Sequence, residues 1–159
     1  DTSSETEHAL ANLGAELLLD TLAAIEQNLA TETHQNHNAV SFAPQLHHSD
    51  GLIDWTKPAR DIHNKVRALH DWPNAYTFLE GTRYIILRSQ ILSATQADIS
   101  STFEPGTIVE AQGESLIVAT GKNTALSLTE IQREGKRKLP MRSFLAGCRW
   151  NAGLAFRDD

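Results

Sequence analysis

Apolar side chains recur every three or four positions near the start of the chain, which predicts one amphipathic helix over residues 4–28. Thr2 stands just before this segment and Glu5 follows three positions later, so the two side chains can form a capping box at the helix N-terminus. The apolar positions of the helix are Leu10, Leu13, Leu17, Leu18, Leu22, Ile25 and Leu29.

Residues 30–50 are mostly polar, contain four histidines and show no long apolar period. We expect a linker or an extended crossing segment here, with a short strand at residues 40–42. A polar stretch between two patterned regions is typical of a domain boundary, so we place one within it.

A second helix is predicted after Thr56, which we expect to be its N-cap, with Pro58 in the first turn. Ile62, Val66 and Leu69 would form its buried stripe, and Pro73 prevents any continuation. We expect the following apolar and aromatic residues around this helix to be structural: Trp55, Ile62, Val66, Trp72 and Pro73.

Beyond Pro73 the pattern changes to the alternation of β-strands separated by turn residues. We expect strands over residues 75–79, 83–92, 107–111, 115–120 and 124–131, with a polar loop at 93–105. A short helix would begin at Pro140, run to about residue 146 and end at Gly147. This order predicts a mainly β protein with flanking helices (α+β): a small OB-like open β-barrel preceded by an amphipathic helix and an extended linker.

Composition narrows the class of protein. A chain of 159 residues with 40% hydrophobic residues can bury one core. The single cysteine excludes an intrachain disulfide and a thiolate zinc cluster. No apolar run approaches the ~18 residues needed to span a bilayer, and the acidic start is unlike a signal peptide. We therefore expect a cytoplasmic protein without membrane contact.

Charge is distributed unevenly along the chain. Residues 1–36 contain seven acidic residues and no lysine or arginine, whereas residues 121–157 contain eight basic residues and two acidic ones. Such asymmetry between segments predicts an anion-binding face in the C-terminal part, although the net charge of the whole chain is −6.

Three motifs that could carry chemistry have simpler explanations. The seven histidines lack the spacing of a zinc site, and we expect no metal. Gly121-Lys122 resembles the end of a phosphate loop, but the position five residues before Gly121, where that motif requires a glycine, is Leu116, so a hairpin turn is the better interpretation. Cys148 lies beside Arg149, which could lower the pKa of its thiol. A lone cysteine near a short helix is more often a packing residue, and we expect no catalytic residue in the chain.

The candidate binding residues are therefore basic. We expect a phosphate-backbone site at Lys136, Arg137, Lys138 and Arg142, with Lys57, Arg60, Lys65 and Arg67 as a second group on the first helix of the barrel. The alternative for the first group is a solvated surface whose charges serve solubility.

Several strings in the chain resemble the region that follows the catalytic domain of methionyl-tRNA formyltransferases. That family typically shows YAPK(I/L), G-x-IDW, IRAF-x-PWPGA, PGTI, VATGDG and EGK(K/R)-x-M. The matching strings, in the same order, are SFAPQL (residues 41–46), GLIDW (51–55), VRAL (66–69), WP (72–73), PGTI (105–108), VATG (118–121) and EGKRK (134–138).

The resemblance implies a division of the chain and a function. Residues 1–33 would be the last helix of the Rossmann-like formyltransferase domain, residues 34–50 the interdomain linker, and residues 51–159 the OB-like domain that helps to bind initiator Met-tRNA. The family transfers a formyl group from 10-formyltetrahydrofolate to the methionine amino group. Its catalytic Asn, His and Asp strings have no counterpart here. We therefore expect the chain to bind no cofactor and to be inactive without the N-terminal formyltransferase domain.

Two alternatives remain open at this point. The chain could be the C-terminal domain of another member of the superfamily, a sugar-amine formyltransferase or formyltetrahydrofolate dehydrogenase, for which a basic RNA-facing surface has no use. It could also be a stand-alone protein-binding barrel. The leucine stripe of the first helix discriminates the last case, because exposed leucines in a complete protein would promote dimerisation or aggregation.

Overall fold

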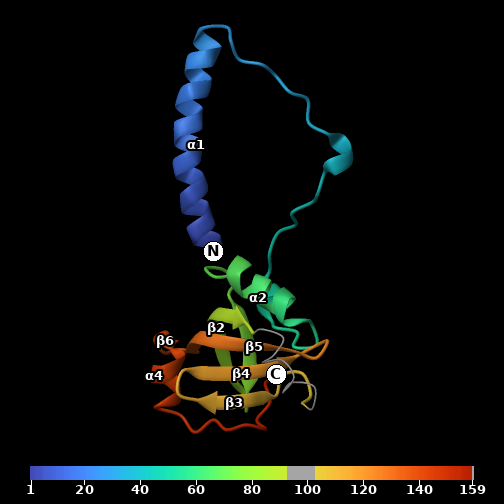
Figure 1. Cartoon of the computed structure of the whole chain (residues 1–159), viewed down its shortest axis with the longest axis vertical. Helices are drawn as coiled ribbons and strands as arrows, with labels where there is room; N and C mark the ends of the chain where they lie inside the picture. Colours follow the sequence, from blue (N-terminus) through green and yellow to red (C-terminus); the bar gives the residue numbers. More distant parts are fainter. Residues whose placement is uncertain (93–102, 159) are drawn as a thin grey trace.

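The computed structural model describes residues 1–92 and 103–158, and Figure 1 shows their arrangement. A long helix and a linker project from a sheet domain, which we define as residues 51–158 and which carries two shorter helices. The six strands form one antiparallel sheet in the order β1-β2-β5-β4-β3, with β6 also paired to β5. This confirms the expected class, mainly β with flanking helices and an open sheet. No helix within the described ranges combines the length and apolarity that a bilayer crossing requires.

The first helix, α1, spans Ser3–Glu26 and begins as its sequence predicts. The Glu5 amide donates to Thr2 Oγ1 at 3.4 Å, and the Thr2 amide donates to Glu5 Oε2 at 2.9 Å, which completes the capping box. All eight large apolar side chains between Leu10 and Leu29 are more than half exposed. The helix therefore has an apolar face that nothing in the described chain covers.

The linker contains no strand. The strand predicted at residues 40–42 is wrong: a 3-10 turn, η1 (His37–Ala39), precedes an extended segment in which Phe42 is 94% exposed. A short segment with alternating apolar residues forms a strand only beside another strand, and this segment lies away from the sheet (Figure 1). A second 3-10 turn, η2 (His48–Gly51), leads the chain back to the sheet domain.

Helix α2 spans Ala59–Ala68, and its N-terminus is capped from a distant strand. The prediction that Thr56 is the N-cap is wrong, because Pro58 occupies that position and the Thr56 hydroxyl donates to Asp54 instead. The Ala59 amide donates to Thr124 Oγ1 at 2.9 Å. A tertiary contact thus supplies the acceptor that the local sequence lacks.

Strand β5 (Thr124–Arg133) is the centre of the sheet. It pairs along its length with β2 (Thr82–Ile91), and β2 pairs in turn with β1 (Ala75–Leu79). On its other edge, β4 (Ser115–Thr120) pairs with the first half of β5, and the short β6 (Leu139–Pro140) pairs with the second half. Because β6 takes this place, the residues that link it to β5 are held at a corner of the sheet.

The last described residues join the two edges of the open sheet. Residues 153–154 exchange backbone hydrogen bonds with Ile108 at the start of β3 (Ile108–Gln112), and Arg157 exchanges two with Phe78 of β1. Phe156, only 3% exposed, lies between these bonds and stacks on Trp55 with ring centroids 5.4 Å apart. The sheet remains open in strand pairing, yet its core is covered.

The core confirms most of the residues expected to be structural around α2. Trp55, Ile62, Val66 and Pro73 are buried. Trp72 is the exception, since 49% of it is exposed. Among the described aromatic residues, its ring packs edge-to-face with His48 alone. The helix α4 (Met141–Leu145) begins one residue after Pro140, close to its predicted start, and packs beside β5 and β6.

Gly121 allows two segments of backbone to touch. Its amide donates to the carbonyls of Trp55 and Lys57, both at 2.9 Å. A Cβ added at Gly121 would lie 1.6 Å from the Thr56 carbonyl oxygen. The glycine of the phosphate-loop-like pair therefore serves close backbone approach at a hairpin turn.

We expect Gly121→Ala to lower the free energy of unfolding by about 3 kcal/mol, because the backbone of residue 56 must move and both hydrogen bonds are then lost. Urea unfolding followed by tryptophan fluorescence measures this change. Gly14→Ala is the control: nothing lies within 4 Å of the added methyl, so the sheet domain should keep its unfolding midpoint. A Gly121→Ala midpoint equal to that of the control would show that this contact is not needed.

Candidate nucleic-acid interface

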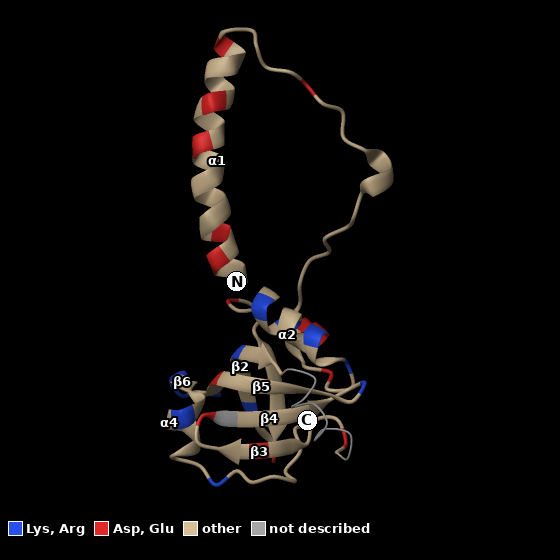
Figure 2. Ribbon diagram, in the orientation of Figure 1, with Lys and Arg blue, Asp and Glu red and all other residues tan. Residues whose placement is uncertain are grey.

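The predicted basic residues lie in two groups on different parts of the sheet domain, as Figure 2 shows near β6 and α4 and on α2. We call residues 136–138 the basic segment. All three of its side chains are exposed, and no carboxylate of the described residues forms an ion pair with them. Their positive charge is therefore available to a partner.

The backbone of the basic segment is held in place. The Lys136 amide donates to the Arg133 carbonyl at 2.9 Å, and Gln132 Nε2 donates to the Lys136 carbonyl at 2.7 Å. The neighbouring acid, Glu134, lies 3.3 Å from Arg83 Nη1, which balances its charge. The loop thus presents its cations from a fixed backbone.

Arg142, the fourth residue predicted for this group, lies on α4 and has a partner. Its Nη1 is 3.1 Å from Glu114 Oε1, and both side chains are about three-quarters exposed, at 77% and 76%. Exposed ion pairs of this kind are weak, about 0–1 kcal/mol, and an RNA phosphate could compete with the carboxylate. Arg142 is therefore less available than the basic segment.

Most of the second group, on α2 and the residues before it, makes contacts within the chain. Lys57 lies 3.7 Å from Asp54. Lys65 Nζ donates to two backbone carbonyls, and Arg67 donates to the Asp1 carbonyl and to an asparagine. Arg60 is exposed, and the described residues give it no carboxylate partner. Lys65 and Arg67 thus hold neighbouring segments of backbone against α2, a structural role that the sequence does not reveal.

A small pocket, which we call the α4 pocket, lies between the basic segment, β2 and α4. Its volume is about 210 Å³, and its lining includes Tyr84, Arg133, Phe144 and Cys148. Tyr84 and Arg133 lie opposite each other in the pairing of β2 with β5, which brings an aromatic ring and a cation to one corner. Strand register is a tertiary property, so no local pattern in the sequence could have identified this pair.

Burial raises the pKa of the Cys148 thiol, so it stays protonated near neutral pH. A protonated thiol is a poor nucleophile, and the lowering effect considered for the adjacent Arg149 does not prevail. The lowered pKa of His63 likewise has burial as its largest cause, and its Nδ1 lies 3.0 Å from Ser89 Oγ. Within residues 1–92 and 103–158, no three His, Cys, Asp or Glu side chains gather closely enough to hold a metal ion.

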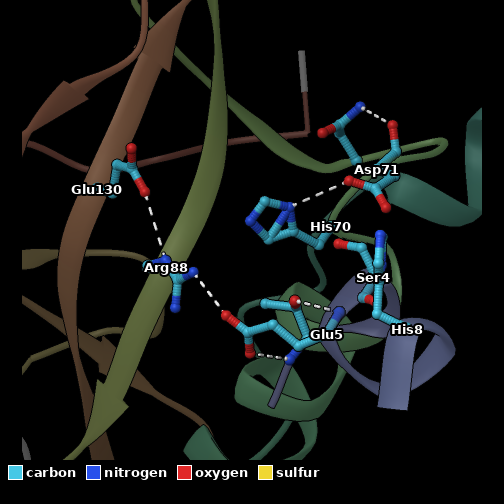
Figure 3. A network of polar contacts seen from close by, with 9 residues as sticks. Ser4, Glu5, His8, His70, Asp71, Arg88 and Glu130 are labelled. Atoms are coloured by element: carbon cyan, nitrogen blue, oxygen red, sulfur yellow. Dashed lines mark hydrogen bonds and ion pairs between the residues drawn. The ribbon is translucent and has the colours of Figure 1, made fainter. Parts of the chain in front are cut away.

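The first turn of α1 is attached to the sheet domain by charge, as Figure 3 shows. Glu5 Oε1 accepts a hydrogen bond from Arg88 Nη2 at 2.9 Å, and Arg88 Nε lies 3.6 Å from Glu130. The pairing of β2 with β5 is irregular on both sides of Arg88, and bulges of this kind redirect side chains. The Thr2 amide and then Arg88 lower the pKa of Glu5 from 4.5 to about 2.

Comparison with known proteins agrees with the strings quoted above. Residues 45–149 match the family model described as "Formyl transferase, C-terminal domain". Proteins named methionyl-tRNA formyltransferase from Koribacter versatilis (strain Ellin345) and Bacillus subtilis (strain 168) are 41% and 35% identical to the chain. These alignments cover 96% and 91% of the chain, but only 46% and 44% of the relatives. The chain therefore spans about half the length of the curated relatives it matches.

Solved structures support the fold. A variant of HypX from Aquifex aeolicus superposes with a TM-score of 0.59 at 18% identity, over 83% of this chain and 22% of that one. The complex of HypX with tetrahydrofolic acid gives 0.58 at 18% identity, over 82% of this chain and 22% of that one. Identities this low establish a shared fold and carry no argument about ligands.

We expect Glu5→Gln to loosen the first turn of α1, since glutamine can keep the capping box but carries no charge for Arg88. Protection of the Thr6 amide against hydrogen exchange should fall about two- to fivefold. In the wild type the same loss should appear as the pH falls from about 4.5 towards 2, because the stabilisation from a lowered carboxyl pKa is complete above the unfolded value and is lost as the pH falls through the folded value. Glu7→Gln makes the same charge change two residues along the helix without a described partner, and equal effects of the two variants would contradict this role.

Proposed function

The chain belongs to the family of formyl transferase C-terminal domains, and from this premise we propose that it is the part of a methionyl-tRNA formyltransferase that binds and orients initiator Met-tRNA. Formyl transfer from 10-formyltetrahydrofolate to the methionine amino group would take place in an N-terminal formyltransferase domain. That domain would carry the family's catalytic Asn, His and Asp strings, which have no counterpart in this chain. The role belongs to translation initiation and accords with the cytoplasmic location expected from the sequence.

The observation that carries the proposal is the charge of the basic segment, which forms no ion pair with a carboxylate among the described residues. Lysine and arginine that neutralise phosphates release condensed counterions, and this release provides most of the sequence-independent affinity for nucleic acid. Cations already paired with carboxylates gain less, because the existing pair must first be broken. Lys136, Arg137 and Lys138 are therefore the preferred phosphate contacts, with Arg142 beside them and Arg60 as the strongest member of the α2 group.

The names of the relatives favour this proposal over the other formyltransferases considered. The Koribacter and Bacillus proteins carry the name methionyl-tRNA formyltransferase and align with most of the chain. A sugar-amine formyltransferase or formyltetrahydrofolate dehydrogenase would have no use for three adjacent unpaired cations. The basic segment and the relatives' names thus support the same substrate class by separate routes.

The proposal also gives the apolar face of α1 a partner. Residues 1–33 would complete the N-terminal formyltransferase domain, residues 34–50 would cross between the domains, and residues 51–159 would face the tRNA. Leucines that are more than half exposed, such as Leu13 and Leu17, would then pack against that domain. The ion pair between Glu5 and Arg88 would set the direction in which the helix leaves the sheet domain.

We expect K136A/R137A/K138A to weaken binding of initiator tRNA at least tenfold at ~100 mM salt and to lower the slope of log affinity against log salt by about 2–3. The charge-matched comparison is K57A/R60A/K122N, in which asparagine suits the positive φ of 58° at residue 122. Its slope should change by less than about 1. Filter binding between ~50 and 200 mM salt measures both variants.

Three outcomes would contradict parts of this proposal. An unchanged slope in the first variant would remove the basic segment as the phosphate site. An equal loss in the second variant would move the RNA towards α2. Wild-type protein that binds no tRNA at the lowest salt would show that this part of the enzyme does not itself hold the substrate.

We expect the 159-residue chain alone to self-associate at micromolar concentration through the apolar face of α1. L13E/L17E should abolish the association, whereas N12E/A23E, which adds two acids on the polar side of the same helix, should not. Sedimentation velocity measures the change, and circular dichroism checks that the helix persists. A monomeric wild-type chain with an intact α1 would contradict the idea that this face requires a partner.

A further inference from the structure

We propose that the α4 pocket holds one unstacked nucleotide of the bound RNA, with its phosphate against Arg133, Lys136 and Arg137 and its base against the aromatic wall formed by Tyr84 and Phe144. This inference rests on the proposed function and specifies how the same surface contacts its partner. It predicts that the domain recognises a single-stranded or looped-out position as well as the phosphate backbone.

The charged residues that line the pocket are all basic. Three of its lining residues, Arg133, Lys136 and Arg137, are basic, and none is acidic. Elsewhere in the part of the chain that the structure describes, several basic side chains lie beside a carboxylate, as Arg83, Arg88 and Arg142 do. An uncompensated group of cations around a concave site is complementary to a phosphate.

The size of the pocket indicates what part of a ligand it can take. Its volume of about 210 Å³ is below the range of about 300–1,000 Å³ typical of sites for whole small molecules. A protruding group of a larger molecule, such as one base, suits this space better than a free metabolite. The surrounding cations can hold the chain from which that group projects.

The aromatic wall of the pocket is packed against the core. The Tyr84 ring packs edge-to-face on Phe144 and Trp150, with centroids 6.0 Å and 4.9 Å apart. Trp150 in turn contacts Phe156, which belongs to the buried core. Unpaired bases bind proteins through contacts of this kind with aromatic rings and arginine planes. An acidic peptide would satisfy the cations but would leave the aromatic wall without a partner.

Cys148 provides a direct test because it lines the α4 pocket and is the only cysteine in the chain. Thiol modification by N-ethylmaleimide at about pH 8, where more of the thiol is ionised, reports whether the pocket is open. Saturating initiator tRNA should slow the modification of the wild-type chain about tenfold. A single-stranded oligonucleotide should protect Cys148 as well, whereas a blunt-ended RNA duplex should bind without protecting it.

Two variants test the contact with the base and the contact with the phosphate one at a time. F144L keeps an apolar side chain but removes the ring, and R133Q removes one cation; each should weaken protection by the oligonucleotide about tenfold. K122N is the matched control, since it removes an exposed cation at the turn between β4 and β5 that does not line the pocket, and it should leave protection unchanged. Circular dichroism, together with the rate at which N-ethylmaleimide modifies Cys148 of each variant in the absence of RNA, checks that the pocket is intact.

The outcomes distinguish this inference from the proposed function. If tRNA binds with the expected salt dependence but Cys148 reacts at an unchanged rate, the pocket proposal is overturned and the proposed function stands. Equal protection by the duplex, or by a poly-glutamate peptide, would also overturn it, in favour of backbone contact or peptide docking. If no RNA binds at all, both fail together.

Discussion

The close backbone contact at Gly121 fixes how the chain enters the sheet domain. Residues 55–57 lie directly against the backbone of the turn between β4 and β5, because Gly121 in that turn has no side chain to keep them apart. On one side of this contact Thr124 caps α2, and on the other Trp55 Nε1 donates to Thr77 Oγ1 at 3.0 Å. The position of α2, and with it the position of Arg67 beneath the start of α1, follows from this one approach.

The opposite corner of the sheet carries the proposed chemistry. Strand β5 is longer than β4, and β6 pairs with the part of β5 that β4 does not reach. The residues between β5 and β6 therefore form a held loop, and α4 follows at once and packs beside it. The basic segment and the α4 pocket both arise from this arrangement, in which one long strand exchanges partners along its edge.

The sequence predicted the elements well where the cause was local. The capping box of Thr2 and Glu5, the alternation of β1 and the hairpin turns all follow from neighbouring residues, and they appear within one or two positions of their expected places. The predictions that are wrong depend on distant partners. Thr56 could cap a helix by type, but Thr124 does so from β5, and residues 40–42 have no neighbouring strand among the described residues to join.

The candidate site shows the same division. The basic segment was evident from composition, because adjacent cations in a turn are exposed in most folds. The sequence did not reveal which of the other cations are already paired. Arg142 forms an ion pair with Glu114, and Lys65 donates to backbone carbonyls, only after the chain has folded. The aromatic wall behind the α4 pocket depends on strand register and on the return of residues 150–156 to the core.

The attachment of α1 at its first turn has a consequence for the length of the linker. Because residues 1–5 contact the sheet domain and the chain returns to it at residue 51, α1 and the linker together form a closed excursion. Doubling the length of a flexible loop costs only about 0.6 kcal/mol of closure entropy. Insertions in residues 30–47 should therefore be tolerated in evolution, whereas the spacing between Thr2 and Glu5 cannot drift without releasing the helix. The length of the linker can therefore vary, whereas the contact at which α1 leaves the sheet domain cannot.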